Sequence, residues 1–254
     1  MSVYLTFDVE PDIHTSRYKS IKEGIPRILK LLDKHNIKAT FFTTCDCIEK
    51  YPKIFQNLKK QGHEIALHGY RHERFDSLSA KEKQSKLKKS ILCFKKHLNQ
   101  KPLGFRSPQH SIDDKTLDLL EKHNFSYDSS YAPLNLLQLL FFPTKPLLWF
   151  KQFFSKNKKY NIRNNLYEIP TSALLFPFVS LVFRAFPFWL IKIYFSLLKL
   201  SSKNQVFYAH SWDFIDVSGK IASIWPKEKL IKNLDLFLSY YKNNKFERIR
   251  DSIK

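Results

Sequence analysis

The chain has 254 residues, of which 43% are hydrophobic and 26% charged, and this composition excludes a largely disordered protein. Its 43 lysines and arginines against 23 acidic residues give a formal charge of +20, which favours anionic partners such as phosphorylated carriers, acidic glycans or lipid head groups. A lysine-rich surface without any such partner is an equally open interpretation. Nucleic acid is not expected as a partner, because the sequence lacks the arginine and aromatic patterning of a nucleic-acid module.

The cysteines and the first residues bear on the compartment. Cys45, Cys47 and Cys93 are an odd number without a CxxC pair, so we expect no disulfide framework and a reducing environment. Cys45 and Cys47 could bind a soft metal, but two semi-buried thiols near a strand end are the preferred interpretation. Met1 leads almost directly into an apolar stretch, without the pattern of a secretory signal. We therefore predict a cytoplasmic protein, free or peripheral at the inner face of the membrane.

Strands and helices alternate along the first half of the chain. Apolar residues recur at helical spacing from Ile21 to Leu32, Gly62 stands where a helix ends, and Ser79 with Glu82 forms a capping pattern. The alternation predicts an α/β fold with a parallel, barrel-like sheet whose functional groups gather at the carboxyl ends of the strands. We expect strands at 3–8, 39–44, 63–67, 104–106 and 125–128, and helices at 20–35, 51–61, 80–98 and 113–123.

The second half departs from this pattern. Residues 131–200 form an insert rich in Phe and Leu, which contains a predicted strand at 166–170 and precedes a last strand at 205–210 and a helix at 226–242. The longest uncharged run, from Ile169 to Phe183, is shorter than the roughly 18–20 residues of a membrane-spanning helix. A surface that rests on a membrane is one interpretation of the insert, and a buried cap or core helix is the preferred one. We expect one domain over residues 1–254.

Two pairs of polar residues suggest a metal site. His68 and His72 are four residues apart, the spacing that places two side chains on one face of a helical turn. Asp8 and Glu10 are two residues apart, the spacing that places them on one face of a strand. Together they predict a site of two histidines and a carboxylate with a second carboxylate beside it, as a hydrolase needs to bind and deprotonate water.

The surrounding segments resemble a known family. Six of them follow one another in order, and together they are similar to the motif series of the polysaccharide deacetylases, also called NodB-homology or carbohydrate esterase family 4 proteins. The resemblance implies a distorted (β/α) barrel, a divalent metal that is usually zinc, and hydrolysis of the N-acetyl group of an amino sugar. The segments are Thr6–Glu10, Lys38–Phe42, Gly62–His72, Gly104–Pro108, Tyr127–Ser130 and Tyr208–Asp213.

The resemblance implies roles for the residues of the metal site. His68 and His72 match the two metal-binding histidines, and Asp8 matches the general base. Many members carry a metal-binding aspartate directly after the base, where this chain has Val9. One branch of the family has Asp-x-Asp or Asp-x-Glu instead, which makes Glu10 the third ligand. An exchange of roles between Asp8 and Glu10 remains open.

The remaining motifs imply an acid and its supports. Arg106 matches an arginine that would hold Asp8 in a bidentate pair and keep it ionised. His210 matches the general acid that protonates the leaving amine. Asp128 is the carboxylate expected to orient His210, although a helix cap is the alternative. Substrate contacts are expected from Tyr70, Trp212, Gln109, which replaces a common aromatic residue, and His14, although a surface position is the preferred interpretation for His14 and His110.

We therefore expect a metal-dependent hydrolase that removes an N-acetyl group from an amino-sugar glycan or glycolipid precursor. The charge and the apolar insert favour a lipid-linked or anionic substrate. Two alternatives remain: hydrolysis of another C–N bond, in a small ureide or amide, on the same fold, and a non-catalytic protein that binds a membrane surface or nucleic acid.

Overall fold

Strand β1 (Ser2–Val9) lies at the centre of a curved sheet and ends at the first predicted site residues. In the computed structural model, which describes residues 1–12, 17–133, 156–174, 176–216 and 226–253, β1 pairs in parallel with β10 (Asn204–His210) and with β2 (Thr40–Thr43). Every residue of β1 after Ser2 is buried, as expected of a central strand covered on both faces.

The described strands form one sheet in the order β10-β1-β2-β3-β4-β5-β7-β6, with β11 beside the start of β1. All of these pairings are parallel except that of β6 with β7. The gap between β7 and β10 is bridged by backbone hydrogen bonds from Ser172 to Val206 and from Tyr208 to Phe178, which supports the predicted distorted barrel. The strands not yet bounded are β3 (Glu64–Leu67), β4 (Gly104–Phe105), β5 (Tyr127–Asp128), β6 (Tyr160–Arg163), β7 (Leu166–Glu168) and β11 (Lys245–Phe246).

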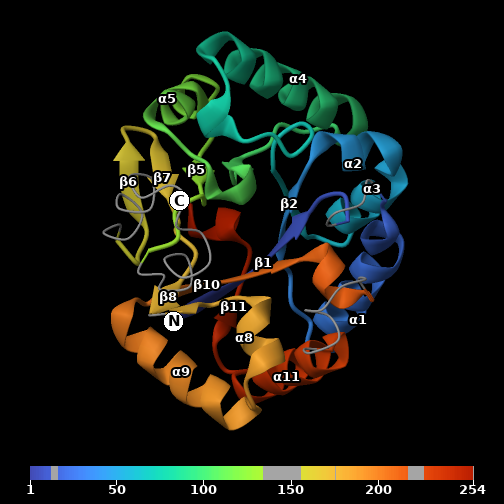
Figure 1. Ribbon diagram of the computed structural model, residues 1–254, viewed down its shortest axis with the longest axis vertical. Coiled ribbons are helices and arrows are strands. Elements are labelled where there is room, and N and C mark those ends of the chain that lie inside the picture. The colour runs from blue at the N-terminus through green and yellow to red at the C-terminus, as the bar shows by residue number, and fades with distance from the viewer. Residues whose placement is uncertain (13–16, 134–155, 175, 217–225, 254) are drawn as a thin grey trace.

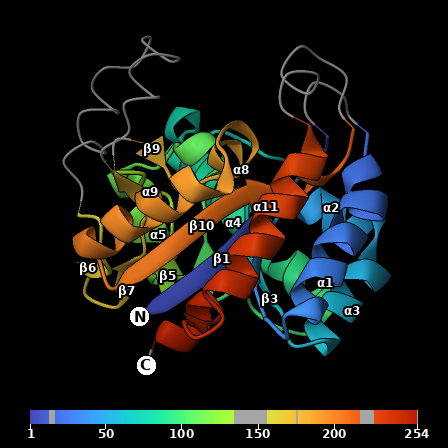
Figure 2. The same cartoon turned by 90° about the horizontal axis from the view of Figure 1, so that it is seen from below.

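Helices surround the sheet, as Figures 1 and 2 show. Helix α4 begins at the predicted capping box, in which the Ser79 side chain accepts from the backbone of Glu82 and the Glu82 carboxylate accepts from the backbone of Ser79. A single π-helical turn, Ser20–Gly24, leads into α1. The helices are α1 (Ile25–Lys34), α2 (Cys45–Lys50), α3 (Pro52–Lys60), α4 (Ala80–Leu98), α5 (Asp114–Lys122), α8 (Ser180–Ala185), α9 (Phe188–Ser201) and α11 (Lys227–Tyr240).

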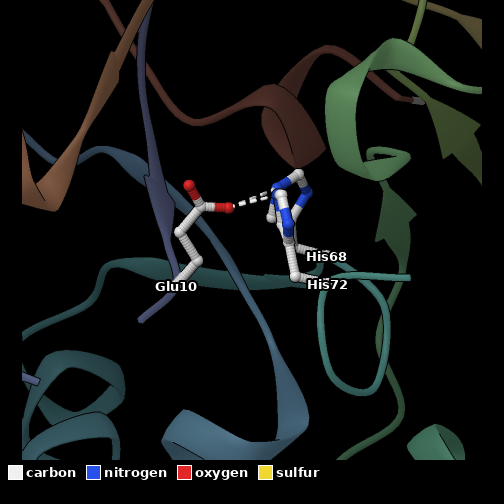
Figure 3. A group of neighbouring side chains, drawn as sticks. All are labelled: Glu10, His68 and His72. Carbon is white, nitrogen blue, oxygen red and sulfur yellow. Dashed lines mark ion pairs between the residues drawn. The ribbon is translucent and has the colours of Figure 1, made fainter. Parts of the chain in front are cut away.

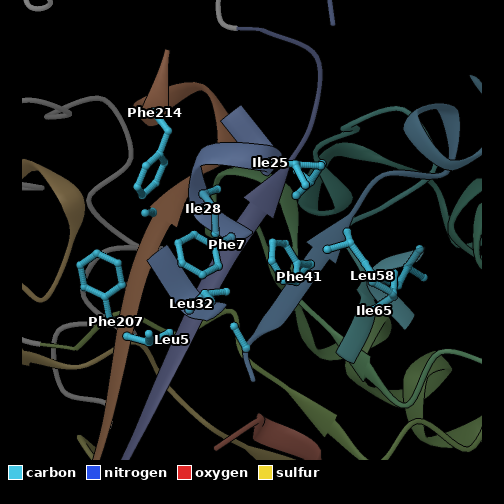
Figure 4. Packing of buried hydrophobic residues seen from close by; sticks show 14 of the residues in the cluster. Leu5, Phe7, Ile25, Ile28, Leu32, Phe41, Leu58, Ile65, Phe207 and Phe214 are labelled. Atoms are coloured by element: carbon cyan, nitrogen blue, oxygen red, sulfur yellow. The ribbon is translucent and has the colours of Figure 1, made fainter. Parts of the chain in front are cut away.

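The main core lies between the sheet and these helices (Figure 4). Phe7 on β1 stacks against Phe41 on β2 with ring centroids 5.3 Å apart, and Ile28 and Leu32 of α1 belong to the same buried cluster. The opposite faces of the strands fill the barrel with a smaller set: Tyr4, Phe42, Ala66, Tyr127, Ile169, Val206 and Ile249. Because side chains alternate along a strand, Thr6 and Asp8 face the same interior as Tyr4.

The insert is divided between core and surface. Its described part contains β6, β7, the short pair β8 (Ala173–Leu174) and β9 (Phe176–Pro177), and helices α8 and α9, whereas residues 134–155 lie outside the described residues. Helix α9 buries Ile191, Phe195 and Leu198 next to α11 and β10, and leaves other apolar side chains exposed. Within the described segments, no helix has both the length and the hydropathy needed to cross a bilayer.

Candidate metal and catalytic site

Glu10, His68 and His72 converge at the carboxyl end of the sheet (Figure 3). Glu10 follows β1 and His68 follows β3, and the two are only 7% and 1% exposed. The Glu10 Oε2 atom forms an ion pair with His72 and lies 3.5 Å from His68 Nε2. The predicted grouping of these three side chains is therefore present in the structure.

The histidines do not share a helical turn as the spacing predicts. Gly69 has φ +83° and His72 has φ +60°, and both conformations are incompatible with a continuous helix. The chain instead leaves β3 in a loop that returns His72 toward His68, with ring centroids 5.2 Å apart. The four-residue spacing therefore predicts correctly that His68 and His72 are neighbours, but the helical turn that it predicts between them is wrong.

A hydrogen bond fixes the orientation of His68. Its Nδ1 lies 2.8 Å from the carbonyl oxygen of Arg106, and since a carbonyl can only accept, Nδ1 carries the proton. The other ring nitrogen, Nε2, faces Asp8 and Glu10 at 3.4 and 3.5 Å. A histidine that donates from one ring nitrogen to a carbonyl and directs the other into the site is typically oriented to bind a metal through that second nitrogen.

Arg106 holds Asp8 in place from inside the barrel. The guanidinium is fully buried, and one of its nitrogens donates to Asp8 Oδ1 at 2.9 Å and to Thr6 at 3.0 Å. The bidentate pair that we predicted is not formed, because the other two nitrogens donate to the carbonyl and hydroxyl of Ser129, each at 2.9 Å. The rings of Phe42 and Tyr208 cover the guanidinium at 4.1 and 5.1 Å.

His210 lies opposite Asp8 across the paired strands β1 and β10. Its Nδ1 faces Asp213 Oδ2 at 3.6 Å, and its backbone N–H donates to the same oxygen at 2.8 Å. Trp212 stacks on the imidazole at 4.1 Å and donates from Nε1 to Glu10 Oε1 at 3.1 Å. His210 Nε2 is 2.6 Å from the Tyr208 hydroxyl and is the ring nitrogen nearest to Glu10.

Asp213, and not Asp128, is therefore the carboxylate that contacts His210. Asp128 is directed elsewhere: it accepts from Ser130 at 2.6 Å and lies beside Glu168 on the adjacent strand. Burial raises the pKa of Asp128 to about 6, and burial together with Asp128 raises the pKa of Glu168 well above its usual range. The two acids thus form a buried pair on adjacent strands, separate from His210.

The expected substrate contacts are dispersed. His14 lies outside the described residues, and Gln109 is exposed in a left-handed conformation with φ +54°. Tyr70 donates to Glu49 at 2.9 Å, on the far side of the His68–His72 loop. Of the expected substrate contacts that the structure describes, Trp212 alone touches the site, through Glu10 and His210. His110 is half-buried against Tyr208, with ring centroids 5.5 Å apart, so our preference for a surface position was wrong.

At Glu10 and His210, charged neighbours oppose the effect of burial on the pKa. Burial alone would raise the pKa of Glu10, but its contacts with His68 and His72 outweigh burial and hold this pKa well below the usual value. For His210 burial acts in the opposite direction and would lower the pKa. The contacts with Asp213 and Glu10 outweigh burial and raise this pKa above the ordinary histidine value. Burial and Arg106 lower the pKa of His110 to about 4, so this ring is neutral near pH 7.

The three converging residues fit a divalent metal ion. Within the described part of the chain, Glu10 Oε2 is buried and accepts no hydrogen bond of regular geometry, although two imidazoles face it. A buried carboxylate oxygen without a regular donor is costly unless a cation takes that place. Two imidazole nitrogens and one carboxylate are also the donor set of many zinc hydrolases, which keep a further position for water or substrate.

Comparisons with known proteins find relatives for the first half of the chain. A model of the polysaccharide deacetylase family matches residues 1–127. A peptidoglycan deacetylase of Helicobacter pylori is 36% identical over 107 residues, 42% of this chain and 36% of that protein. A peptidoglycan-N-acetylglucosamine deacetylase of Bacillus cereus is 31% identical over 123 residues, 48% of this chain and 42% of that protein. The matches therefore span less than half the length of these curated relatives.

A solved structure extends the likeness of the fold to nearly the whole chain. A Mycobacterium smegmatis protein classed as a polysaccharide deacetylase superposes with a TM-score of 0.71 at 18% identity, covering 97% of this chain and 85% of that one. At this identity the superposition supports the barrel fold alone. The family match, in contrast, includes Asp8, Glu10, His68, His72 and Arg106.

Proposed function

The chain belongs to the polysaccharide deacetylase family, and we propose that it is a metal-dependent hydrolase that removes an N-acetyl group from an amino-sugar glycan. The convergence of Glu10, His68 and His72, with Asp8 beside them, is the observation that carries the proposal. These three residues would hold the ion, with zinc as the expected metal. When bound, such an ion supplies a Lewis acid and lowers the pKa of water.

Asp8 is suited to accept the proton of the attacking water. Its Oδ1 is tied to Arg106, while its Oδ2 is directed toward His68 and the site. A general base must have an oxygen within reach of the proton that it accepts, and Oδ2 is the Asp8 oxygen that faces the site. Arg106 is itself held by Ser129 and Thr6, so Asp8 remains in one orientation.

His210 is suited to protonate the departing nitrogen from the opposite side. Its raised pKa favours the imidazolium form, and Asp213 fixes the ring through Nδ1 so that Nε2 faces the site. Breaking an amide bond requires this proton, because an amide anion is a poor leaving group. Acetate and the free amino sugar are the products of this reaction.

We further propose that the substrate is lipid-linked or anionic and is met at a membrane surface. Helix α9 supports this, because it exposes Trp189 by 58% and Leu200 by 84%, has two lysines and contains no acidic residue. An apolar helix face flanked by cations is typical of helices that lie in the interface of an anionic bilayer. The cytoplasmic location remains a prediction from cysteine usage.

The proposal is tested by measuring acetate release from a panel of substrates. We expect zinc-loaded protein to release acetate from N-acetylated amino sugars, faster from a lipid-linked or phosphorylated substrate than from a neutral oligosaccharide. Equal rates on charged and neutral substrates would refute the substrate preference while leaving the deacetylase intact. Turnover of a ureide such as allantoin without acetate release from any sugar would favour the alternative C–N hydrolase.

A further inference from the structure

A second group of metal-ligating side chains lies between α2 and α4, outside the site described above. Glu49 in the last turn of α2 meets Cys93 and His97 of α4, and one ligand atom from each lies within 4.8 Å of the others. The three offer a carboxylate oxygen, a thiol sulfur and an imidazole nitrogen. None of them takes part in the proposed deacetylation.

The helices bring these residues together by regular geometry. Cys93 and His97 are four residues apart on α4, so both project from one face of that helix. Helix α2 packs against this face and presents Glu49 from the other side. Cys93 is only 4% exposed whereas Glu49 lies at the surface, so the group extends from the core to solvent and is open to an incoming ion.

Glu49 is held in position toward this group. The Tyr70 hydroxyl donates to Glu49 Oε1 at 2.9 Å, which orients the carboxylate and leaves Oε2 available. Cys45 lies one turn earlier on α2, but burial and the neighbouring Cys93 raise the pKa of its thiol far above the usual range, and this thiol is directed at the carbonyl of Ser90 at 3.8 Å. The Cys93 thiol also donates to a carbonyl, that of Cys45 at 3.7 Å, but Cys93 lies within ligand distance of both Glu49 and His97, and Cys45 is not part of that group.

We propose that Glu49, Cys93 and His97 bind one divalent ion of borderline softness, such as zinc. A site with a thiolate sulfur and an imidazole nitrogen selects zinc over magnesium or calcium, which prefer oxygen donors. Cys93 loses its proton when the ion binds, and the exposed side of the group leaves the fourth position to water. The ion joins α2 to α4 as a cross-link.

The cross-link bears on the loop between the two metal-binding histidines. The backbone N–H of Cys45 donates to Gly69 at 3.2 Å, and that of Asp46 donates to Tyr70 at 3.1 Å. Through these bonds, and through the contact of Tyr70 with Glu49, α2 supports the segment that joins His68 to His72. An ion on α2 and α4 thus steadies the loop that positions His72.

Cobalt(II) titration tests this site without any measurement of activity, because a thiolate ligand gives cobalt a near-ultraviolet charge-transfer band that the Glu10–His68–His72 site cannot give. The titration is made on His68→Ala, whose first site lacks a ligand. We expect the band to saturate at one equivalent, to disappear when Cys93→Ser is added, and to persist with Cys47→Ser. Cys47 is the matched control, since it is a buried cysteine of α2 whose sulfur contacts Thr44 instead.

Wild-type protein gives a second measurement if His68→Ala does not fold. We expect two bound equivalents of cobalt in the wild type and one in Cys93→Ser, with the charge-transfer band lost in the variant. Cobalt-loaded protein without a thiolate band would overturn the proposal, and so would a band that survives Cys93→Ser. Either result leaves the deacetylase proposal untouched, because the first site contains no sulfur.

Discussion

Asp8 and Glu10 lie on one face of the same strand end but have different surroundings. Asp8 is tied to the buried guanidinium of Arg106, whereas Glu10 faces the imidazoles of His68 and His72. Strand alternation alone predicts that the two carboxylates share a side, and the structure confirms it. Their division into base and ligand rests on the contacts of each carboxylate.

The division can be tested with two isosteric substitutions. We expect Asp8→Asn to retain zinc while acetate release falls by about 10²–10⁴-fold, the usual contribution of a general base. Glu10→Gln is expected to lose zinc, because an amide oxygen is a much weaker ligand than a carboxylate. Metal content by elemental analysis and the rate of acetate release check both. Loss of zinc in Asp8→Asn with retention in Glu10→Gln would exchange the two roles.

Asp213 determines how His210 titrates. Its carboxylate stabilises the imidazolium and so raises the pKa of His210. If the imidazolium is the acid, activity is lost as the pH rises through this pKa. Asp213→Asn removes the stabilising charge, so we expect the alkaline limb of the pH–rate profile to move to lower pH and kcat to fall by less than the about 10²–10⁴-fold that loss of the general acid itself would cost.

Asp128→Asn is the matched control for this experiment, because Asp128 lies in the separate pair with Glu168. The alkaline limb of this variant is expected to stay where it is in the wild type. A limb that moves in Asp128→Asn and not in Asp213→Asn would restore the role that the sequence suggested for Asp128.

At the scale of elements, the sequence predicts those with a strong periodic or capping signal. Helix α4 begins and ends at the predicted residues, because the capping pattern at Ser79 is unambiguous and the amphipathic stretch is long. Helix α2 is missed because its six residues are too few to show a period. The two-residue strand β11 is missed for the same reason, since its pairing with β1 is decided by tertiary contacts.

In the site, as in the elements, the sequence predicts what regular structure places and misses what a short turn places. Residues at strand ends, such as Asp8, His68 and His210, are predictable because a parallel sheet gathers those ends at one edge. Asp213 follows His210 by three residues in a short 3₁₀ turn, Ser211–Phe214, and the turn brings the carboxylate back to the ring. The sequence shows that Asp213 is only three residues from His210. It does not show that the intervening turn directs the carboxylate toward the imidazole.

The register of β4 against β5 depends on a glycine. A Cβ at Gly104 would come within 1.9 Å of the Tyr127 ring, which fills the barrel behind Arg106. We expect Gly104→Ala to lower the free energy of unfolding by about 1–3 kcal/mol, the cost of overpacking a filled interior. Urea denaturation measures this change.

Removing the clash provides the control for this prediction. In a Tyr127→Val background, Gly104→Ala should cost much less than in the wild type, because the ring atoms that the new methyl group meets are gone. An equal loss of stability in both backgrounds would mean that the ring is not the cause.

At the scale of the whole molecule, the charge of +20 is combined with one exposed apolar helix face. Helix α9 exposes Trp189, Ile193, Leu197 and Leu200 while its other face packs into the core. The helix therefore contributes both to the core and to the exposed surface, and contact of that surface with a membrane stays a proposal. Cationic charge attracts such a face to anionic lipid, and burial of the apolar side chains would retain it there.

Vesicle co-sedimentation tests the role of α9. We expect the protein to bind vesicles with anionic lipid and to bind neutral vesicles much less, and the double variant Ile193→Glu with Leu197→Glu to lose most of this binding. Leu92→Glu is the control, because Leu92 is an exposed leucine on α4, with 62% exposure against 51% for Ile193 and 49% for Leu197. Equal binding by both variants would assign the attraction to overall charge and not to α9.

Metal-dependent acetate release tests the central claim most directly. The protein is stripped of metal, and acetate release from an N-acetylated amino-sugar substrate is measured before and after zinc is restored, for the wild type and for His68→Ala. We expect stripped protein to release no acetate, zinc to restore acetate release in the wild type, and zinc to restore none in His68→Ala. Release that is indifferent to zinc, or recovery in His68→Ala equal to that of the wild type, would contradict this claim.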